Sequence, residues 1–224
     1  MNYTFIILGI ILILVLYVLY RYLYDRQTMV STKVYLKDKP PDKSFEELSN
    51  PASSRYSYNI WIYITTLTKT SEKIFSIQDG DGSNTALYKF ELKAYSDGSL
   101  KYKINSFDDN IITSNFPLQK WVCITVSVDN NVVDLYLDGK LVKSQKFAAA
   151  GMIAPTKTCK ISFGNGDIYV AQFERLPYPI DPQTAWDRYM AGNGGSYIGN
   201  SFASYGANLI LTKDQLDMKK FNLF

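Results

Sequence analysis

The sequence contains no histidine and only two cysteines in 224 residues. Histidine is the one side chain whose unperturbed pKa lies in the physiological range, so its absence excludes Ser-His-Asp and Cys-His nucleophile systems and every imidazole metal site. The two cysteines, Cys123 and Cys159, are too few for a disulfide-stapled secreted module, although one bridge between them stays open. A hydrolase that works with carboxylates alone is still compatible with this composition.

A strong charge of either sign is also missing. The 24 basic and 21 acidic side chains give 24 − 21 = +3, and no segment concentrates the lysines or arginines. We therefore expect no nucleic-acid partner. The hydrophobic share of 46% and the charged share of 20% are typical of a globular chain. No cofactor is expected.

One long apolar run stands at the start of the chain. It reads FIILGIILILVLYVLY from Phe5 to Tyr20 and covers roughly 24 Å as a helix. With flanking tyrosines and a snorkelling arginine it approaches the ~30 Å of a bilayer core, so we predict a transmembrane helix over 3–24. A signal peptide would need a basic start and a cleavage site of small residues, and a core helix would have a polar face. The predicted anchor residues are Phe5, Ile6, Leu14, Leu19 and Arg21.

Basic residues orient this anchor. They all follow the apolar run, beginning with Arg21 and Arg26 and continuing with Lys33, Lys37 and Lys39. The positive-inside rule then places the N-terminus across the membrane and the rest of the chain on the cytosolic side. The expected localisation is a single-pass membrane protein, with the lipid bilayer as one partner.

The remainder divides into a tether over 25–55 and a domain over 56–224. The tether has a charged stretch with a proline pair at Pro40 and Pro41, which is typical of an unpacked linker. The domain has short segments of period two, separated by Asp-Gly and Asn-Gly turns. These segments predict strands at 56–67, 86–94, 100–104, 121–128, 132–137 and 141–147. The fold class is therefore mainly β, an antiparallel β-sandwich or jelly roll.

Two helices are predicted within the domain. Asp181 caps the first, which continues through Pro182 to Ala191 and ends at Gly192. The second is a short turn over 213–219. An apolar strand at 209–211 is expected to close the sandwich beside the tether, rather than to bind a partner.

Part of the domain resembles a known superfamily. The segment 117–144 is similar to the laminin-G-like branch of the concanavalin A-like lectin/glucanase superfamily, in which a tryptophan opens one strand and the next ends in aromatic-x-Asp-Gly. Trp121, Tyr136, Asp138 and Gly139 occupy these positions, and Trp61 matches an early buried tryptophan. Segments 161–165 and 169–173 are similar to the late strands. This resemblance implies the fold and leaves the function open.

Candidate active and metal sites are few. Glycosidases of this superfamily carry a Glu-x-Asp-x-x-Glu arrangement, which is absent here, so we predict no catalytic residues and no enzyme. Asp79 and Asp81 lie in a loop that partly resembles a calcium loop, but it lacks the sixth-position glycine and the final glutamate. We therefore expect no metal, with these two aspartates as secondary candidates. Carbohydrate is a possible partner for which the sequence indicates no specific site.

A membrane-anchored sandwich without catalytic residues is suited to connecting a bilayer to a protein layer. Proteins of this arrangement resemble structural proteins of large double-stranded DNA viruses, in which an internal membrane lies beneath an icosahedral shell. The resemblance implies a minor capsid component of the virion, with other capsid proteins as partners. The alternative function is a membrane-anchored, lectin-like module that binds carbohydrate or protein.

Overall fold

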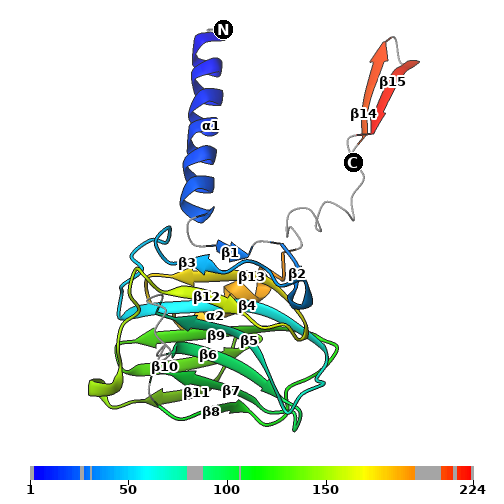
Figure 1. The fold of residues 1–224 in the computed structure, drawn as a ribbon. Helices are drawn as coiled ribbons and strands as arrows, with labels where there is room; N and C mark the ends of the chain where they lie inside the picture. Colours follow the sequence, from blue (N-terminus) through cyan, green and yellow to red (C-terminus); the bar gives the residue numbers. More distant parts are fainter. Residues whose placement is uncertain are drawn as a thin grey trace.

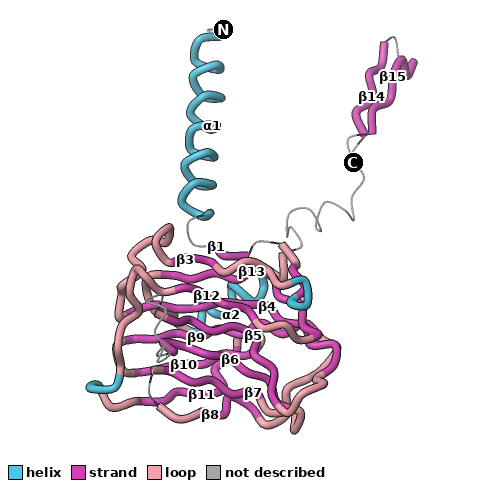
Figure 2. The backbone as a smooth tube through the Cα atoms, viewed as in Figure 1, coloured by secondary structure: helices cyan, strands magenta, loops and turns pink. Residues whose placement is uncertain are grey.

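A computed structural model describes residues 3–25, 28–30, 32–79, 88–105, 107–194, 208–213 and 216–222. Its main body consists of two antiparallel β-sheets packed face to face (Figure 1). The tube view shows the same arrangement, with strands dominating and little helix in the body (Figure 2). The predicted antiparallel β-sandwich of the jelly-roll type is confirmed.

The first sheet, sheet A, has seven strands. Its main path runs in the order β1 (Thr28–Val30), β13 (Asp167–Leu176), β4 (Arg55–Thr66), β9 (Trp121–Asp129), β10 (Val132–Leu137) and β11 (Lys140–Lys146). The short strand β2 (Val34–Tyr35) also pairs with β13. Strands β4 and β9 are buried along most of their length, because the core covers one face and α2 covers part of the other, whereas β11 is an edge strand without a buried position.

The second sheet, sheet B, has six strands. Their order is β3 (Lys43–Ser44), β12 (Lys160–Phe163), β5 (Ser71–Gln78), β6 (Tyr88–Tyr95), β7 (Leu100–Ile104) and β8 (Asn110–Thr113). One face of each sheet points into a shared apolar core. Ile60, Ile62 and Ile64 line it from β4, and Phe90 and Leu92 line it from β6. The opposite face of each sheet points outward, because neighbouring side chains on a strand alternate in direction.

Helix α2 (Pro182–Met190) lies against the outer face of sheet A, where Tyr189 packs on Trp61, Cys123 and Ala171. The carboxylate of Asp181 accepts a hydrogen bond from the backbone N–H of Thr184 at 2.7 Å, and Pro182 fits the first turn. Ala185 is fully buried against Tyr136, Leu176 and Ile180. The predicted helix after Asp181 is therefore present, with the predicted cap.

The segment expected to be an unpacked tether is part of the sandwich. Between residues 28 and 44 it forms β1, β2, the 3-10 turn η1 (Leu36–Asp38) and β3. Leu36 and Phe45 are fully buried, and β1 and β3 join sheets A and B respectively. The tether prediction is wrong for this segment, because strands of two or three residues are too short to show a hydrophobic period.

The apolar strand predicted at 209–211 is present, but its predicted place in the sandwich and the predicted helical turn at 213–219 are wrong. Strands β14 (Asn208–Lys213) and β15 (Leu216–Asn222) form a separate antiparallel hairpin. They pair with each other and not with any described strand of the sandwich. The expected helical turn at 213–219 thus spans the end of one strand and part of the next. Alternation of Leu216, Asp217 and Met218 fits a strand as well as a short amphipathic turn.

The N-terminal apolar run forms helix α1 (Tyr3–Asp25), which projects from the sandwich near β1 (Figure 1). Its side chains are described from Ile7 to Tyr20, a stretch of roughly 21 Å. Among the residues that the structure describes, no helix is long and apolar enough to cross a membrane. The predicted membrane-spanning helix is therefore not confirmed. One further 3-10 turn, η2, covers Ala149–Gly151.

Candidate binding surfaces

The motif residues Asp138 and Gly139 form the turn between β10 and β11. The Asp138 carboxylate accepts a hydrogen bond from the backbone N–H of Cys123 at 2.9 Å. Both turn residues have positive φ, 48° and 74°, and Trp186 of α2 lies directly over Gly139, where a Cβ would come within 3.0 Å of the Trp186 Cα. The Asp-Gly pair is thus required by the turn and by the packing of α2.

Two aromatic motif residues, Tyr136 and Trp61, form the surface on which α2 packs. Tyr136 packs beneath Ala185, and Trp61 packs with Cys123 and Ala171 on the outer face of sheet A. The Trp61 ring stacks on Tyr189 with centroids 5.7 Å apart. Tyr136 and Trp61 therefore have a packing role, since both hold α2 against sheet A. This role explains why the motif is typical of the fold.

The calcium candidate Asp79 is engaged in protein contacts. Its carboxylate accepts hydrogen bonds from the hydroxyls of Thr158 at 2.6 Å and Thr156 at 3.0 Å. The ammonium group of Lys89, whose side chain is 7% exposed, lies 4.0 Å away and would repel a cation. Asp81 lies outside the described residues. Within the described ranges no group of three or more Cys, Asp or Glu side chains could hold a metal ion.

The two cysteines are both free and buried. Cys159 belongs to the core between the sheets, whereas Cys123 lies on the outer face of sheet A beneath α2. Burial raises the pKa of the Cys123 thiol to about 12, so it is inert at neutral pH. The question of a bridge between them is answered, since sheet A separates the two thiols.

Three buried glutamates have packing roles. Glu72 accepts hydrogen bonds from the backbone N–H and hydroxyl of Thr68 at 3.1 and 2.9 Å. Glu91 pairs with Lys93 at 2.8 Å, and Glu174 pairs with Arg188 of α2. These contacts assign each carboxylate a local structural partner.

A row of four aromatic side chains crosses the outer face of sheet A. Tyr35 on β2 is paired in register with Tyr169 on β13, Tyr169 with Tyr63 on β4, and Tyr63 with Trp121 on β9. The ring centroids of these successive pairs are 4.5, 6.1 and 5.6 Å apart. All four side chains are partly exposed. We call Tyr35, Tyr63, Trp121 and Tyr169 the aromatic row.

Charged groups border the aromatic row at the β2 end. The Lys33 ammonium lies 4.2 Å from the centroid of the Tyr169 ring. The Tyr35 hydroxyl donates to Asp167 at 2.9 Å, and Lys37 pairs with the same carboxylate at 3.1 Å. Both contacts lower the pKa of the Asp167 carboxyl, and the hydrogen bond from Tyr35 has the larger effect. The surface therefore combines aromatic rings with two cations, Lys33 and Lys37, and one anion, Asp167.

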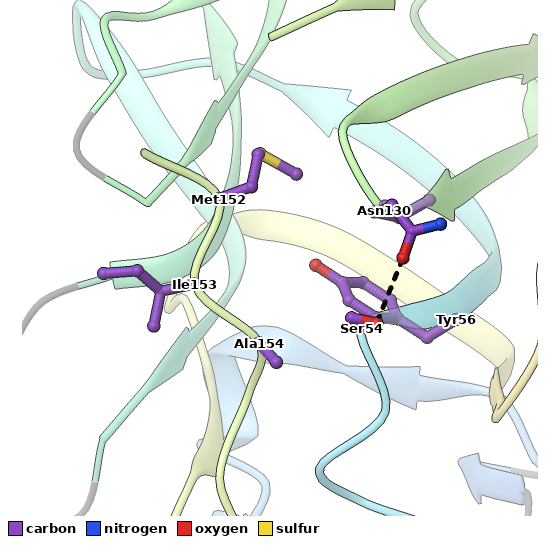
Figure 3. Close-up of a pocket in the computed structure, with 7 residues that line it drawn as sticks. Ser54, Tyr56, Asn130, Met152, Ile153 and Ala154 are labelled. Carbon is purple, nitrogen blue, oxygen red and sulfur yellow. Dashed lines mark hydrogen bonds between the residues drawn. The ribbon is translucent and has the colours of Figure 1, made fainter. Parts of the chain in front are cut away.

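A small hollow lies between the start of β4 and the loop after η2. Figure 3 shows its lining, in which the Ser54 hydroxyl donates to Asn130 at 3.3 Å beside Tyr56. Met152, Ile153 and Ala154 close it from the loop. Its space for a water-sized molecule is about 10 Å³, which holds a single water at most. It is too small for a sugar ring.

The comparison with protein families is decisive for the fold. A sequence profile described as "Concanavalin A-like lectin/glucanases superfamily", of the laminin-G type, matches residues 41–198. The chain belongs to this superfamily. No sequence among curated proteins matches it.

Two solved structures illustrate the concanavalin A-like likeness. Trypanosoma rangeli sialidase in complex with sialic acid aligns with a TM-score of 0.52 at 10% identity, over 61% of this chain and 23% of the sialidase. The ligand-binding domain of botulinum neurotoxin serotype D, in complex with N-acetylneuraminic acid, aligns with a TM-score of 0.54 at 14% identity. That match covers 73% of this chain and 44% of the toxin chain. At these identities the likeness shows the fold alone.

The aromatic row of this concanavalin A-like domain was not predicted from the sequence. Its members come from four distant segments, and Tyr35 lies in the stretch interpreted as a tether. Alternation within β4 and β13 places Tyr63 and Tyr169 on an outer face, but the strand order and register are needed to align them. Only the cross-strand pairing turns these scattered tyrosines into one surface.

Proposed function

We propose that this chain is a non-enzymatic structural protein that attaches a concanavalin A-like sandwich to lipid through α1. The observation that carries the proposal is the exposed apolar surface of α1. Its large described side chains are between 46% (Val15) and 69% (Ile13) exposed, and the run from Ile7 to Val18 has no charged residue. An apolar surface on every side of a helix favours insertion into lipid or burial in an apolar assembly.

The connection between α1 and the sandwich is short. The helix ends at Asp25 and β1 begins at Thr28, so sheet A lies close to the end of the helix. Basic residues follow the helix, and the proposal therefore places the N-terminus across the membrane and the sandwich on the cytosolic side. In the setting implied by the virion resemblance, this side faces the capsid shell, and the protein is a minor capsid component.

Vesicle flotation tests the lipid attachment. We expect the full chain to float with phosphatidylcholine vesicles and the variant Ile10→Lys/Leu14→Lys to stay in the dense fraction. Each lysine in the middle of an apolar helix costs roughly 2.5–3.5 kcal/mol in a bilayer. The matched control is Leu118→Lys/Ile153→Lys, which makes the same charge change at side chains of the sandwich that are 47% and 46% exposed.

The control should float like the unchanged chain. Equal flotation of both double variants would show that α1 is not the lipid attachment. Protection of an N-terminal epitope from protease added outside sealed vesicles, with the sandwich accessible, is the result expected for the proposed orientation.

A second candidate function is carbohydrate binding at the aromatic row. Sugar rings present flat C–H faces that stack on aromatic side chains, and the row offers four partly exposed rings. The Lys33 ammonium lies over two of them, Tyr169 at 4.2 Å and Trp121 at 5.9 Å, so a sugar would displace it from these faces. Strands lie about 4.8 Å apart, so the row extends roughly 14 Å, enough for two or three sugar units. The sialidase and toxin structures contain sialic acid, an anionic sugar whose carboxylate would pair with Lys33. The competing explanation is that cross-strand aromatic pairs simply stabilise the sheet.

Titration with 3′-sialyllactose, followed by saturation-transfer NMR, tests this second function. We expect Trp121→Ala to weaken binding by roughly 5- to 150-fold, since one aromatic ring contributes roughly 1–3 kcal/mol when a nucleic-acid base stacks on it. The control Trp186→Ala removes a 39% exposed indole from α2, outside the row, and should leave the affinity unchanged. Absence of saturation transfer at millimolar ligand, or equal losses in both variants, would contradict carbohydrate binding at the row.

A further inference from the structure

The outer face of sheet B differs chemically from that of sheet A. Lys93 stands between the buried residues Leu92 and Ala94 on β6, and Lys101 between Leu100 and Tyr102 on β7. Both lysines therefore point away from the core. In register they lie directly opposite each other, and Lys73 on β5 lies directly opposite Lys93. We call Lys73, Lys93 and Lys101 the lysine row.

Three like charges in register on adjacent strands work against the stability of a sheet. Each ammonium group nevertheless has its own anchor. Lys93 pairs with Glu91 at 2.8 Å, Lys73 donates to the Ser76 hydroxyl at 3.3 Å, and Lys101 lies 4.2 Å from the centroid of the Tyr95 ring. Two of these anchors are neutral, so the row keeps a net positive charge in a fixed arrangement.

The acidic groups near the row do not neutralise it. The Glu91 carboxylate is already paired with Lys93. The Asp97 carboxylate, which attracts Lys101 electrostatically, accepts hydrogen bonds from the backbone N–H and hydroxyl of Ser99 at 2.8 and 2.6 Å. Glu91 also lies directly opposite Lys103 of β7, which adds a further positive charge to this face. The Asp109 carboxylate accepts a hydrogen bond from the Tyr95 hydroxyl at 2.8 Å, so its partner is a tyrosine and not a lysine of the row.

We infer that the lysine row is a docking surface for an acidic helix of a partner protein. With strands about 4.8 Å apart, the three lysine positions extend over roughly 10 Å. Carboxylates at positions i, i+4 and i+7 of a helix share one face and extend over about 10.5 Å, so they match the row. Among the described residues of this face there is no arginine, and the one ring, Tyr95, is covered by Lys101, which makes the face a poor platform for nucleic-acid bases. Charge complementarity thus favours a carboxylate partner.

This inference gives the proposed structural role a partner surface that is independent of lipid. The test therefore uses the full chain in neutral detergent, without vesicles. The probe is a fluorescent synthetic helical peptide with glutamates at every third or fourth position, measured by anisotropy at 50 and 200 mM salt. We expect binding that weakens with salt.

The variant Lys73→Gln/Lys101→Gln removes two row lysines and keeps the Lys93–Glu91 pair. We expect its peptide dissociation constant to rise roughly tenfold, because two of the three ion pairs with the peptide would be lost. Its melting temperature should rise by about 1–2 °C, since two like-charge oppositions disappear. Weaker binding together with higher thermal stability distinguishes a docking role from a structural one.

The matched control is Lys140→Gln/Lys146→Gln, which removes two exposed lysines from β11 of sheet A. It should bind the peptide within twofold of the unchanged chain. Equal losses in the two double variants, no peptide binding at 50 mM salt, or tighter binding of a single-stranded oligonucleotide than of the peptide would each overturn the inference. Lipid flotation is measured separately, so a failure here leaves the proposed lipid attachment standing.

Discussion

Replacement of Arg175 by methionine is expected to lower the free energy of unfolding by about 3 kcal/mol. The Arg175 side chain is 1% exposed, although it carries a charge. Its guanidinium donates to the carbonyl oxygens of Ser49, Asn50 and Pro51, at 3.4, 3.4 and 3.0 Å. Methionine has a similar length and no donor, so three carbonyl groups would lose a partner, and the one on Pro51 lies at a buried position.

The aromatic surroundings add to this effect. The guanidinium carbon lies 5.2 Å from the Phe45 ring centroid and 5.6 Å from that of Tyr56. The arginine thus connects β13 to the chain before β4, and cation–π contacts of desolvated groups contribute up to about 2 kcal/mol. Methionine would keep the apolar contact with both rings but not the electrostatic part.

Thermal unfolding of the full chain in neutral detergent, followed by near-ultraviolet circular dichroism, measures the change. For a domain of this size, about 3 kcal/mol corresponds to a melting temperature lower by roughly 6–12 °C. The control is Arg55→Met, because Arg55 is 56% exposed and pairs with Asp129 at 2.9 Å. An exposed pair is worth at most about 1 kcal/mol. Equal shifts for both variants would contradict the role assigned to the buried arginine.

The sequence predicts the elements whose patterns are local. β4, β7 and β10 alternate regularly, and α2 carries its cap at Asp181 and a proline in its first turn, so each was predicted within a few residues. The Asp138-Gly139 turn supplied both a hairpin and a superfamily motif. These features depend on residues near one another in the chain, which is why a single sequence reveals them.

Strand β5 was missed because its pattern is interrupted. Its register with β6 shifts between Lys73 and Phe75, so Ile74 and Phe75 are both buried and the alternation is lost. The bulge in β13, where Gln172 has a φ of 46°, likewise disturbs the pattern between Ala171 and Phe173. A bulge changes which face a side chain occupies, and a propensity argument does not detect it.

The aromatic row and the lysine row depend on strand order. The sequence shows Lys-x-Glu-x-Lys at 89–93 and Lys-x-Lys at 101–103, which indicates outward lysines on two strands. It does not show that Lys73, Lys93 and Lys101 become neighbours. The small net charge obscured them further, because it sums over the whole chain and says nothing about where the lysines gather.

Gly164→Ala is expected to destabilise the sandwich by about 3 kcal/mol. Gly164 follows β12, and its backbone N–H donates to the Ile74 carbonyl at 3.0 Å. A Cβ at this position would overlap with the carbonyl oxygen of Lys73, a backbone atom of β5. The clash is removed only if β12 and β5 separate at this end, so the requirement for glycine comes from close approach of two strands.

A second glycine separates this effect from backbone strain. Gly192, after α2, has a φ of +81°, and a Cβ at this position would meet no other atom within 4 Å, so Gly192→Ala should cost only about 1 kcal/mol for the left-handed conformation. Thermal unfolding of both variants is the measurement, and equal losses would show that steric overlap is not the cause.

Since the overlap is with Lys73, Gly164→Ala should also displace one end of the lysine row. We therefore expect it to weaken binding of the acidic helical peptide at temperatures where the variant is still folded.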